Sequence, residues 1–568
     1  MALALALTLL AGCGKDEQQV ESGGVPTNDT APADSAEPKV DEMYKFAVGK
    51  VEQDERGIAL SNYTYDVPFC TSDEVLTYWT TNWTPQIISE DGFSSMAYPQ
   101  MLREMTGVNI EWIIAPANSR GEQYSTLLAS DSLFDMMGCA LSFHPGSVPD
   151  AIADGYYANL YDYMDYMPNY TYQIAKWDYD KDVLNRIFYD DELIACFYGM
   201  TYNPTPRMGY CIRGDFLDQV GMKAEDIDTY DKVHNALVAF KSAGLSEYPM
   251  DICKYVEQDM GILAAGMGTY LYCNGTSLPP ARVVDGKAVF TLTEEDDRKA
   301  MQMLSSWFSE GLINPDWASV SDTTDIQVRL SGDGSAYTYC QPSARDSMVA
   351  MNSNPDCRWD FLVRPRENSG DYLKIGTKID KFTFGNTAIS ANCENIPLAV
   401  SWCDWFYSEE GSFNASYGPR GITWDYNDNG DVRLTDFVRK NEDGVSQSWM
   451  LATYAMNGLC DHGLYQNFRS CAYDGGDYQV EWMMGWAEPS GEKVYDWPIS
   501  CKFTTEETEN ITKIGSDLIT YISENWTAFI DGSRSMSEWD DYVAGCKSIG
   551  LDDLQAIYQD SYDRYLAD

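Results

Sequence analysis

The feature that most constrains this fold is a regular alternation of strand-like and helix-like segments early in the chain. Residues 75–80 are rich in aromatic and β-branched residues, which is typical of a strand. Apolar residues then recur at helical spacing over 98–105, and Gly107 predicts the end of that helix. A strand, a helix and a third short strand are expected within 108–137. This β-α-β-α-β order predicts a parallel sheet with helices on its faces.

The same alternation restarts after residue 209. It predicts strands at 210–213 and 380–389 and helices at 214–217, 233–240, 294–308, 397–405, 511–521 and 554–565. Because 568 residues exceed an ordinary single domain, we expect a large two-part α/β fold with parallel-rich sheets and a helical C-terminal end.

The charge of the chain excludes several classes of partner. Asp and Glu number 88 against 39 Lys and Arg, a formal net charge of −49. Nucleic acids and anionic lipids require a positive protein surface that displaces counterions, so we expect no nucleic-acid partner. Hydrophobic residues make up 44% of the chain, which is enough for large packed cores.

The first residues have the composition of an export signal. The apolar run within 1–13 is shorter than the roughly 20 residues that span a bilayer, so it predicts a signal peptide rather than a membrane helix. Leu10-Ala11-Gly12-Cys13 resembles a bacterial lipobox, which predicts cleavage before Cys13 and lipidation of its thiol. The polar stretch after it predicts a flexible tether, so 14–69 holds this tether and the segment that leads into the fold.

Motifs for common catalytic and metal sites are missing from the sequence. Three histidines and no HExxH exclude a His-rich zinc site, and there is no GxSxG, P-loop or GxGxxG. Pairs of carboxylates for glycoside hydrolysis stay open, because 88 acidic residues make chance pairs inevitable. The cysteines other than Cys13 show no CxxC, and we expect them to be mostly free.

Taken in order and spacing, several short segments resemble the extracellular solute-binding proteins, family 1, of bacterial ABC importers, most closely the large lipoproteins of sugar uptake. The resemblance covers nearly the whole chain after the tether. It is carried by Met105-Thr106-Gly107-Val108, Leu127-Leu128-Ala129-Ser130-Asp131, Phe134-Asp135-Met136, Arg213-Gly214-Asp215-Phe216-Leu217 with Gly221, Gly311-Leu312-Ile313-Asn314-Pro315, Trp405-Phe406-Tyr407-Ser408-Glu409-Glu410-Gly411 and Tyr417-Gly418 to Trp424.

The resemblance implies a two-lobed periplasmic-binding-protein-like fold of type II, with lobe 1 at 70–205 plus 385–480 and lobe 2 at 206–384 plus 481–568. Crossings between the lobes are implied near 198–208 and 383–386. The protein would then be a monomer that binds an oligosaccharide or another small solute in the cleft and catalyses no reaction. It would deliver that solute to ABC permease subunits at the extracellular face of the bacterial cell membrane, held there only by its lipid anchor. The alternatives are a secreted glycoside hydrolase and a surface glycan-tethering protein.

Candidate ligand-binding residues follow strands or lie near the implied lobe junctions. Tryptophan rings stack on sugar rings, and amide, hydroxyl and guanidinium groups bind hydroxyls. The candidates are Trp79, Asn82, Trp83, Ser142, Gln341, Arg420, Trp424, Trp482 and Trp486, with Arg345 as a further cation. The alternatives are core packing for the tryptophans, solvation for the polar residues and a local ion pair for Arg420.

One loop matches the spacing of an EF-hand. Its candidate calcium ligands are Asp425, Asn427, Asn429, Asp431 and Asp436, with Gly430 at the turn. Asp436 stands where a bidentate Glu is usual, and Arg433 is unfavourable for a cation. The alternative is a hairpin turn, which Asn429-Gly430 favours by itself. No other cofactor is expected, and calcium stays open.

Overall fold

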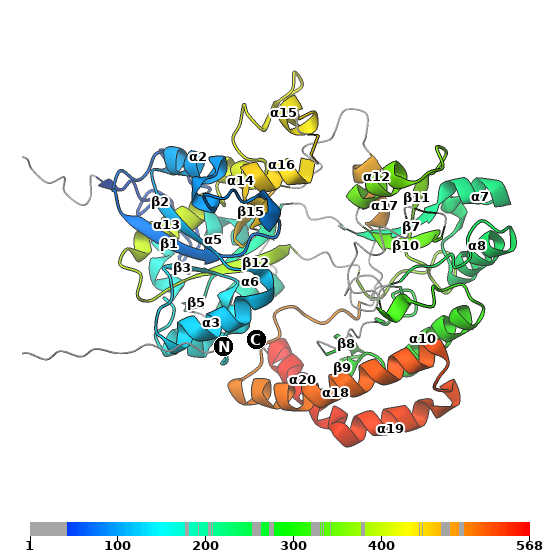
Figure 1. Cartoon of the computed structure of the whole chain (residues 1–568). Coiled ribbons are helices and arrows are strands. Elements are labelled where there is room, and N and C mark those ends of the chain that lie inside the picture. The colour runs from blue at the N-terminus through cyan, green and yellow to red at the C-terminus, as the bar shows by residue number, and fades with distance from the viewer. Residues whose placement is uncertain are drawn as a thin grey trace, which may run out of the picture. The chain divides into compact units, whose positions relative to one another are not determined.

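A six-stranded sheet is the centre of the first part of the fold in this computed structural model (Figure 1). The structure describes residues 43–176, 181–190, 192–202, 206, 208–252, 263–271, 278–319, 330, 332, 334–340, 342–376, 381–441, 444–445, 447–459, 461–466, 478–487 and 494–567. The strand order is β15 (Gly463–Tyr465), β6 (Phe197–Thr201), β12 (Phe382–Ile389), β3 (Met136–Gly138), β1 (Val75–Thr80) and β2 (Asn109–Ile114). Five of these strands run parallel, and β12 alone is antiparallel to its neighbours.

A second sheet is built from residues further along the chain. Its order is β10 (Tyr337–Cys340), β7 (Gly209–Arg213) and β11 (Trp359–Leu362), with antiparallel pairing on both sides of β7. Parallel bridges from Met250 to Tyr337 and to Ile313 extend it beyond β10. The parallel pairing of this sheet therefore lies at its margin.

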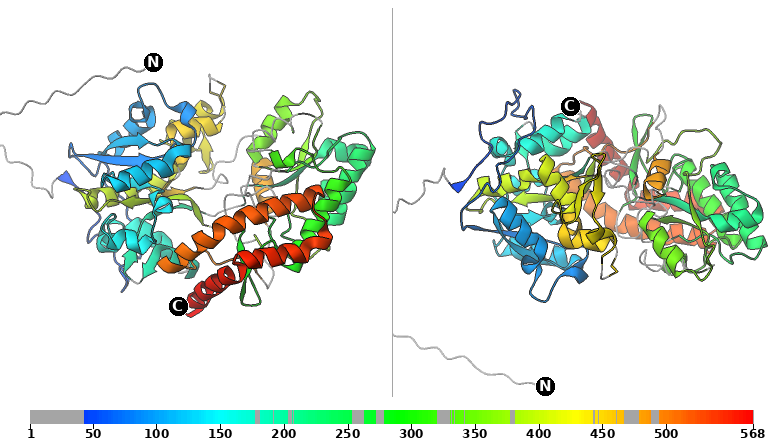
Figure 2. Two further views of the ribbon diagram at one scale, coloured as in Figure 1. Left: turned by 60° about the horizontal axis from the view of Figure 1, so that its bottom comes forward. Right: turned by 90° about the horizontal axis from the view of Figure 1, so that it is seen from above.

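The helices cover both sheets and form the C-terminal end. They are α2 (Ala97–Thr106), α3 (Arg120–Ala129), α4 (Val148–Ala153), α5 (Pro168–Ala175), α6 (Lys181–Ile187), α7 (Gly214–Val220), α8 (Tyr230–Ser242), α10 (Glu295–Ser309), α12 (Pro342–Met351), α13 (Ile396–Trp405), α14 (Glu409–Tyr417), α15 (Asp436–Arg439), α16 (Gln447–Tyr454), α17 (Tyr478–Trp486), α18 (Thr505–Asp531), α19 (Trp539–Ile549) and α20 (Leu551–Ala567). Figure 2 shows α18, α19 and α20 packed together, which confirms the helical C-terminal end.

Local signals explain where several helices begin and end. Thr229 accepts a hydrogen bond from the Lys232 N–H at the start of α8, as expected of an N-cap. Gly107 takes the left-handed conformation at the end of α2, with φ +77°. The predicted strands and helices are present close to their expected positions, although α18 extends six residues before and ten residues beyond the expected 511–521.

Two hydrophobic cores, built from separate parts of the chain, hold the sheets and helices together. The first draws its residues from 44–202 and 382–465, and the second draws its residues from 208–362 and 497–558. Two smaller clusters centre on Trp359 with α17 and on Trp424 with α15. The segment before β1 joins the first core through buried Ala47, Ile58 and Phe69, so the folded part begins well before residue 70.

The connections between the two sheets lie close to the expected crossings, with one correction. The chain leaves the first sheet after Thr201 and enters the second at Gly209, within the expected 198–208. It has returned by Phe382, which pairs with Met200 in the first sheet. The second crossing therefore precedes 383–386, because β12 already begins at Phe382.

Three further observations bear on the expectations from sequence. Of the helices that the structure describes, none has the length and apolar character needed to cross a bilayer. Among the described cysteines, the structure gives Cys70, Cys139, Cys196, Cys340, Cys393 and Cys403 as free of disulfides. The signal-peptide and lipobox residues 1–13, including Cys13, lie outside the described residues, as does Gln341.

Candidate functional site

Five parallel strands of the first sheet end at one edge. Residues that follow β1, β2, β3, β6 and β15 therefore meet there, beside the start of the antiparallel β12. Ligands of open α/β sheets bind beyond the carboxyl ends of the strands. We call this the carboxyl edge and take it as the candidate site.

The residues after β1 supply both an exposed aromatic ring and an unpaired amide. The Trp83 side chain is 55% exposed, and the backbone N–H of Trp83 donates to Gly458 O at 2.8 Å. Asn82 is 3% exposed, and its Oδ1 accepts from the Thr84 N–H at 2.8 Å. Within the described part of the chain, no group accepts from the buried Asn82 Nδ2. Leaving a buried donor unpaired costs about 1–3 kcal/mol, which favours a bonding role for this amide.

Hydrogen bonds fix the loop after β1 to the loop after β2. The Thr81 hydroxyl donates to Ala115 O at 2.9 Å, and the Ala115 N–H donates to Thr80 O at 2.7 Å. The backbone beneath Trp83 is thereby held in place. Such support keeps a binding residue in one orientation before a ligand arrives.

Asp461 connects several polar side chains beneath the carboxyl edge. Its carboxylate accepts from the Tyr78 hydroxyl at 3.1 Å, from the Thr80 hydroxyl and from the Cys139 thiol at 3.3 Å. Burial raises the pKa of Asp461, and the nearby Arg120 opposes this shift. Burial, with the Asp461 charge, raises the pKa of Cys139 to about 12, so this thiol is a poor nucleophile near neutral pH.

His462 lies next to Asp461 and is also fully buried. Its Nδ1 lies 2.9 Å from the Thr387 hydroxyl and 3.3 Å from the Tyr78 hydroxyl. Burial lowers the pKa of His462 to about 3, so the imidazole is neutral at physiological pH. The polar residues under the edge therefore form a fixed network around β1, β3 and β12.

Arg120 and Trp79 form a second support beneath the same edge. Trp79 is 1% exposed, and the Arg120 guanidinium lies 5.2 Å from its ring. Arg120 also donates to Gly138 O at the end of β3. The Trp79 ring is therefore packed below the edge, which is the alternative considered for it, while the neighbouring Trp83 is on the surface. Ser142 follows β3 and is exposed, and its hydroxyl donates to Cys139 O at 2.5 Å.

The other predicted tryptophans are packed in smaller clusters. Trp424 stacks on Phe413, with ring centroids 4.9 Å apart, and its Nε1 donates to Gly418 O. Trp482 and Trp486 are on α17, with Trp486 Nε1 donating to Tyr210 O at 3.0 Å. All three are at most 5% exposed. That these three tryptophan rings take part in ligand binding stays a prediction.

Arg420 forms the local ion pair considered for it. Its Nε lies 3.0 Å from Asp425 Oδ1, and its guanidinium lies 4.7 Å from the Tyr426 ring. Arg345 is half-buried on α12.

The EF-hand-like loop folds as a hairpin between β13 (Trp424–Tyr426) and β14 (Val432–Leu434). Several of its oxygen atoms have protein partners: Asn427 Oδ1 accepts from the Asn429 and Asp431 N–H groups, and Asp436 pairs with Arg439. Asp425 pairs with Arg420 as described. The described residues contain no group of three or more His, Cys, Asp or Glu that could hold a metal. In this geometry the loop shows no calcium site among the described residues, and calcium binding stays a prediction.

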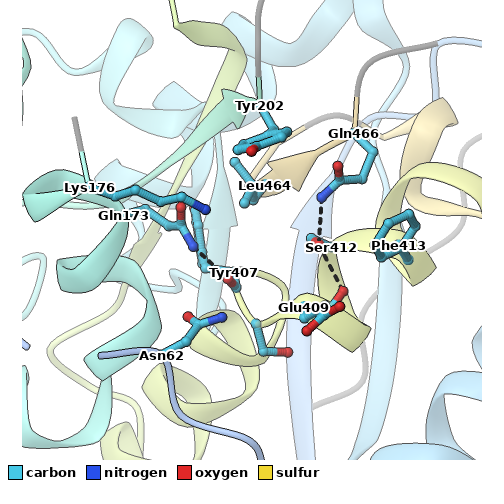
Figure 3. Close-up of a pocket in the computed structure, with 11 residues that line it drawn as sticks. Asn62, Gln173, Lys176, Tyr202, Tyr407, Glu409, Ser412, Phe413, Leu464 and Gln466 are labelled. Atoms are coloured by element: carbon cyan, nitrogen blue, oxygen red, sulfur yellow. Dashed lines mark hydrogen bonds between the residues drawn. The ribbon is translucent and has the colours of Figure 1, made fainter. Parts of the chain in front are cut away.

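A pocket of about 240 Å³ lies next to the ends of β6 and β15 (Figure 3). Tyr202 and Gln466, which directly follow these strands, line it together with residues of α5, α14 and the segment before β1. We did not expect these residues from the sequence, because the short β15 gave no strand signal. The lining residues are Asn62, Gln173, Lys176, Tyr202, Tyr407, Ser408, Glu409, Ser412, Phe413, Leu464 and Gln466.

No protein-family model and no curated protein matches this sequence. Solved structures do match it. The substrate-binding protein FusA of a Streptococcus pneumoniae ABC transporter, in complex with kestose, is 18% identical, with a TM-score of 0.67 over 87% of this chain and 100% of that chain. A solute-binding protein of Bifidobacterium longum infantis, described as HMO-binding and ABC-transporter-associated, is 17% identical, with a TM-score of 0.65 over 86% of this chain and 99% of that chain.

The alginate-binding protein AlgQ2, solved without calcium ion, is 18% identical, with a TM-score of 0.63 over 87% of this chain and 99% of that chain. At these identities the likeness shows the fold. The expected two-lobed α/β fold is therefore confirmed, as is the resemblance to ABC-importer binding proteins at the level of fold.

Proposed function

We propose that this chain is a lipid-anchored extracellular solute-binding protein that captures an oligosaccharide or another small solute and delivers it to an ABC permease. The observation that carries the proposal is the fold, which extends over 87% of this chain and the whole of a protein in complex with kestose. Binding and release would follow from different affinities of open and closed forms, without a chemical step.

The two lobes of this proposal are 70–205 plus 385–480 and 206–384 plus 481–568, with the solute between them. The two separate hydrophobic cores support this division. The strand pairing of Phe382 supports a boundary just before β12, and the packing of α17 with Trp359 supports placing the whole helix in the second lobe.

In the first lobe, we propose that solute binds at the carboxyl edge. Trp83 supplies an exposed ring for the C–H face of a sugar, and Asn82 and Ser142 supply hydrogen-bonding groups beside it. Trp79 and Arg120 support this surface from below. A hydroxyl oxygen of a bound sugar would accept a hydrogen bond from the Asn82 Nδ2, which has no acceptor among the described residues.

The membrane attachment of this proposal rests on the N-terminal residues. The apolar run and Leu10-Ala11-Gly12-Cys13 favour export, with a lipid on Cys13 at the extracellular face of the membrane. A monomer tethered in this way suits transfer of solute to permease subunits in the same membrane. Two permease genes beside the gene for this chain are expected.

A thermal-shift screen against monosaccharides, oligosaccharides and peptides tests the proposal. A ligand at 100 times its dissociation constant stabilises a binding protein by about 2.7 kcal/mol. We expect an oligosaccharide to raise the melting temperature and to be recovered intact, as mass spectrometry would show. If only peptides stabilise the protein, the sugar assignment is wrong, and if the glycan is cleaved, the binding-only role is wrong.

Trp83→Ala tests the site itself. Loss of an exposed stacking ring should weaken oligosaccharide affinity about tenfold or more, measured by titration calorimetry, and leave the melting temperature of the free protein unchanged. Tyr372→Ala is the matched control, because Tyr372 is another exposed aromatic, at 61% exposure, in the second part of the fold. Equal affinity in both variants would remove Trp83 from the site.

A further inference from the structure

The pocket beside β6 and β15 contains an unpaired polar atom deep in its lining. Gln173, on α5, is 2% exposed, and its Nε2 donates to Tyr407 O at 3.2 Å. Its Oε1 is buried, and no donor among the described residues reaches it. A buried acceptor without a donor is uncommon and costs about 1–3 kcal/mol, so an occupant that donates a hydrogen bond here is favoured.

The pocket surrounds Gln173 with groups of mixed chemistry. Figure 3 shows Gln173 and Lys176 on one side and Gln466, Ser412 and Glu409 on the other, with Tyr202 and Leu464 between them. The Lys176 ammonium lies 4.8 Å from the Tyr202 ring. Gln466 Nε2 donates to the buried Ser412 hydroxyl at 2.9 Å, which leaves the Gln466 Oε1 to accept from a ligand. The pocket thus offers acceptors, a cationic donor and an aromatic face.

The dimensions and charges of the pocket restrict its occupant. A volume of about 240 Å³ is below the roughly 300–1,000 Å³ of sites for drug-sized ligands. Lys176 and Glu409 carry opposite charges, so the pocket does not select an anion or a cation. Neighbouring hydroxyls, which both donate and accept, match the amides, and ring C–H groups match the face of Tyr202.

We propose that this pocket, which lies at the β6 and β15 end of the carboxyl edge, is a second ligand site apart from the residues around Trp83, and that it binds one small polyhydroxylated ring of monosaccharide size. A hydroxyl of this ligand donates to Gln173 Oε1, and Lys176 donates to another of its oxygens. The proposal does not depend on the proposed transport function, since it rests on the pocket alone.

Titration calorimetry with glucose, galactose, fructose and N-acetylglucosamine tests this site on the full chain. We expect at least one of them to bind the wild type, and Gln173→Leu and Lys176→Met each to weaken that binding about tenfold. Trp83→Ala should leave it unchanged. Lys440→Met, which changes an exposed lysine outside the pocket, is the control for Lys176→Met.

The variants also separate this proposal from the proposed function. Because Lys176 is exposed, Lys176→Met keeps the test decisive even if Gln173→Leu fails to fold. If none of the four sugars binds, the second-site proposal is wrong. It is also wrong if only Trp83→Ala weakens the binding, or if amino acids bind in place of the sugars. Oligosaccharide binding lost in Trp83→Ala but kept in Gln173→Leu concerns only the site around Trp83.

Discussion

Asp404, on α13, is a fully buried carboxyl group that joins three segments of the first core. It accepts from the Tyr170 N–H at 2.7 Å, from Asn169 Nδ2 at 3.0 Å and from the Tyr65 hydroxyl at 2.9 Å. Burial raises the pKa of Asp404 to about 7, although these hydrogen bonds oppose the shift. The segment before β1, α5 and α13 therefore meet at a group that titrates close to neutral pH.

This shift predicts the direction of a pH effect on stability. Between about pH 4 and pH 7 the native state binds more protons at Asp404 than the unfolded state, so the free energy of unfolding falls as pH rises through this window. The full effect is on the order of 4 kcal/mol. Asp404→Asn should reduce this fall, measured by urea unfolding at pH 5 and pH 8.

Two comparisons isolate the contribution of Asp404. Buried His462, with its pKa lowered to about 3, acts in the opposite direction, because stability falls as the unfolded histidine gains a proton below its ordinary pKa. Because His462 is present in both the wild type and the variant, its contribution cancels when their free energies of unfolding are subtracted. Asp428→Asn removes an exposed carboxylate and should keep the wild-type pH dependence. If Asp404→Asn matches Asp428→Asn, Asp404 is not the source.

At the scale of single elements, the end of α2 depends on one glycine. Gly107 has φ +77°, and a Cβ there would lie 1.8 Å from the Cys70 carbonyl oxygen. The helix ends there because glycine takes the left-handed conformation freely, and no side chain fits against the Cys70 backbone.

Gly107→Ala should lower the free energy of unfolding by about 3 kcal/mol or more, since it combines a backbone clash with left-handed strain. Gly221→Ala is the matched control. Gly221 ends α7 with φ +72°, and a Cβ there meets nothing within 4 Å, so only about 1–2 kcal/mol of strain applies. Equal losses in both variants, measured by urea unfolding, would exclude the contact with Cys70.

The β13–β14 hairpin gives a second prediction at this scale. Because Asp425 and Asp436 pair with arginines, and Asn427 bonds its own turn, calcium would have to displace these partners. We expect millimolar calcium to raise the melting temperature no more than equal magnesium does. A calcium-specific rise that Asp425→Asn abolishes would show that the loop binds the ion after all.

At the scale of the whole molecule, the net charge of −49 dominates electrostatics. Self-repulsion destabilises a compact chain of one sign, and salt shortens its range from about 30 Å at 0.01 M to about 10 Å at 0.1 M. Exposed ion pairs contribute little to stability. Screening them with salt therefore removes little of the stability that is gained when the self-repulsion is weakened.

The melting temperature should therefore rise by a few degrees between about 10 mM and about 100 mM sodium chloride. Potassium chloride should have the same effect, because screening depends on ionic strength and not on the cation. A melting temperature that is constant or falls over this range would show that local ion pairs outweigh the repulsion.

The strands and helices that the sequence predicts are present, but β10, β11, β15 and helices such as α5 and α19 were not predicted. Asn82 and Trp83 could be placed at the end of a strand from the sequence, because they directly follow a strong strand signal at 75–80, and their role in binding stays a prediction. Tyr202 and Gln466 follow strands too, but β15 has only three residues and takes its place through pairing with β6. Asp461 gave no sequence signal, because its partners Tyr78 and Cys139 are hundreds of positions away. Arg120 gave none either, because its contacts with Trp79 and Gly138 depend on how β1 and β3 are placed.

By itself the sequence determined the early β-α-β-α-β order, where helices such as α2 and α8 begin or end, and the acidic charge. These properties depend on periodicity, caps and composition, which are local or additive. Only the tertiary structure decided that Trp79 is packed and Trp83 exposed, and that Tyr202 and Gln466 share a pocket with Gln173. Such placements depend on strand pairing between distant segments, and no local pattern records which strands become neighbours.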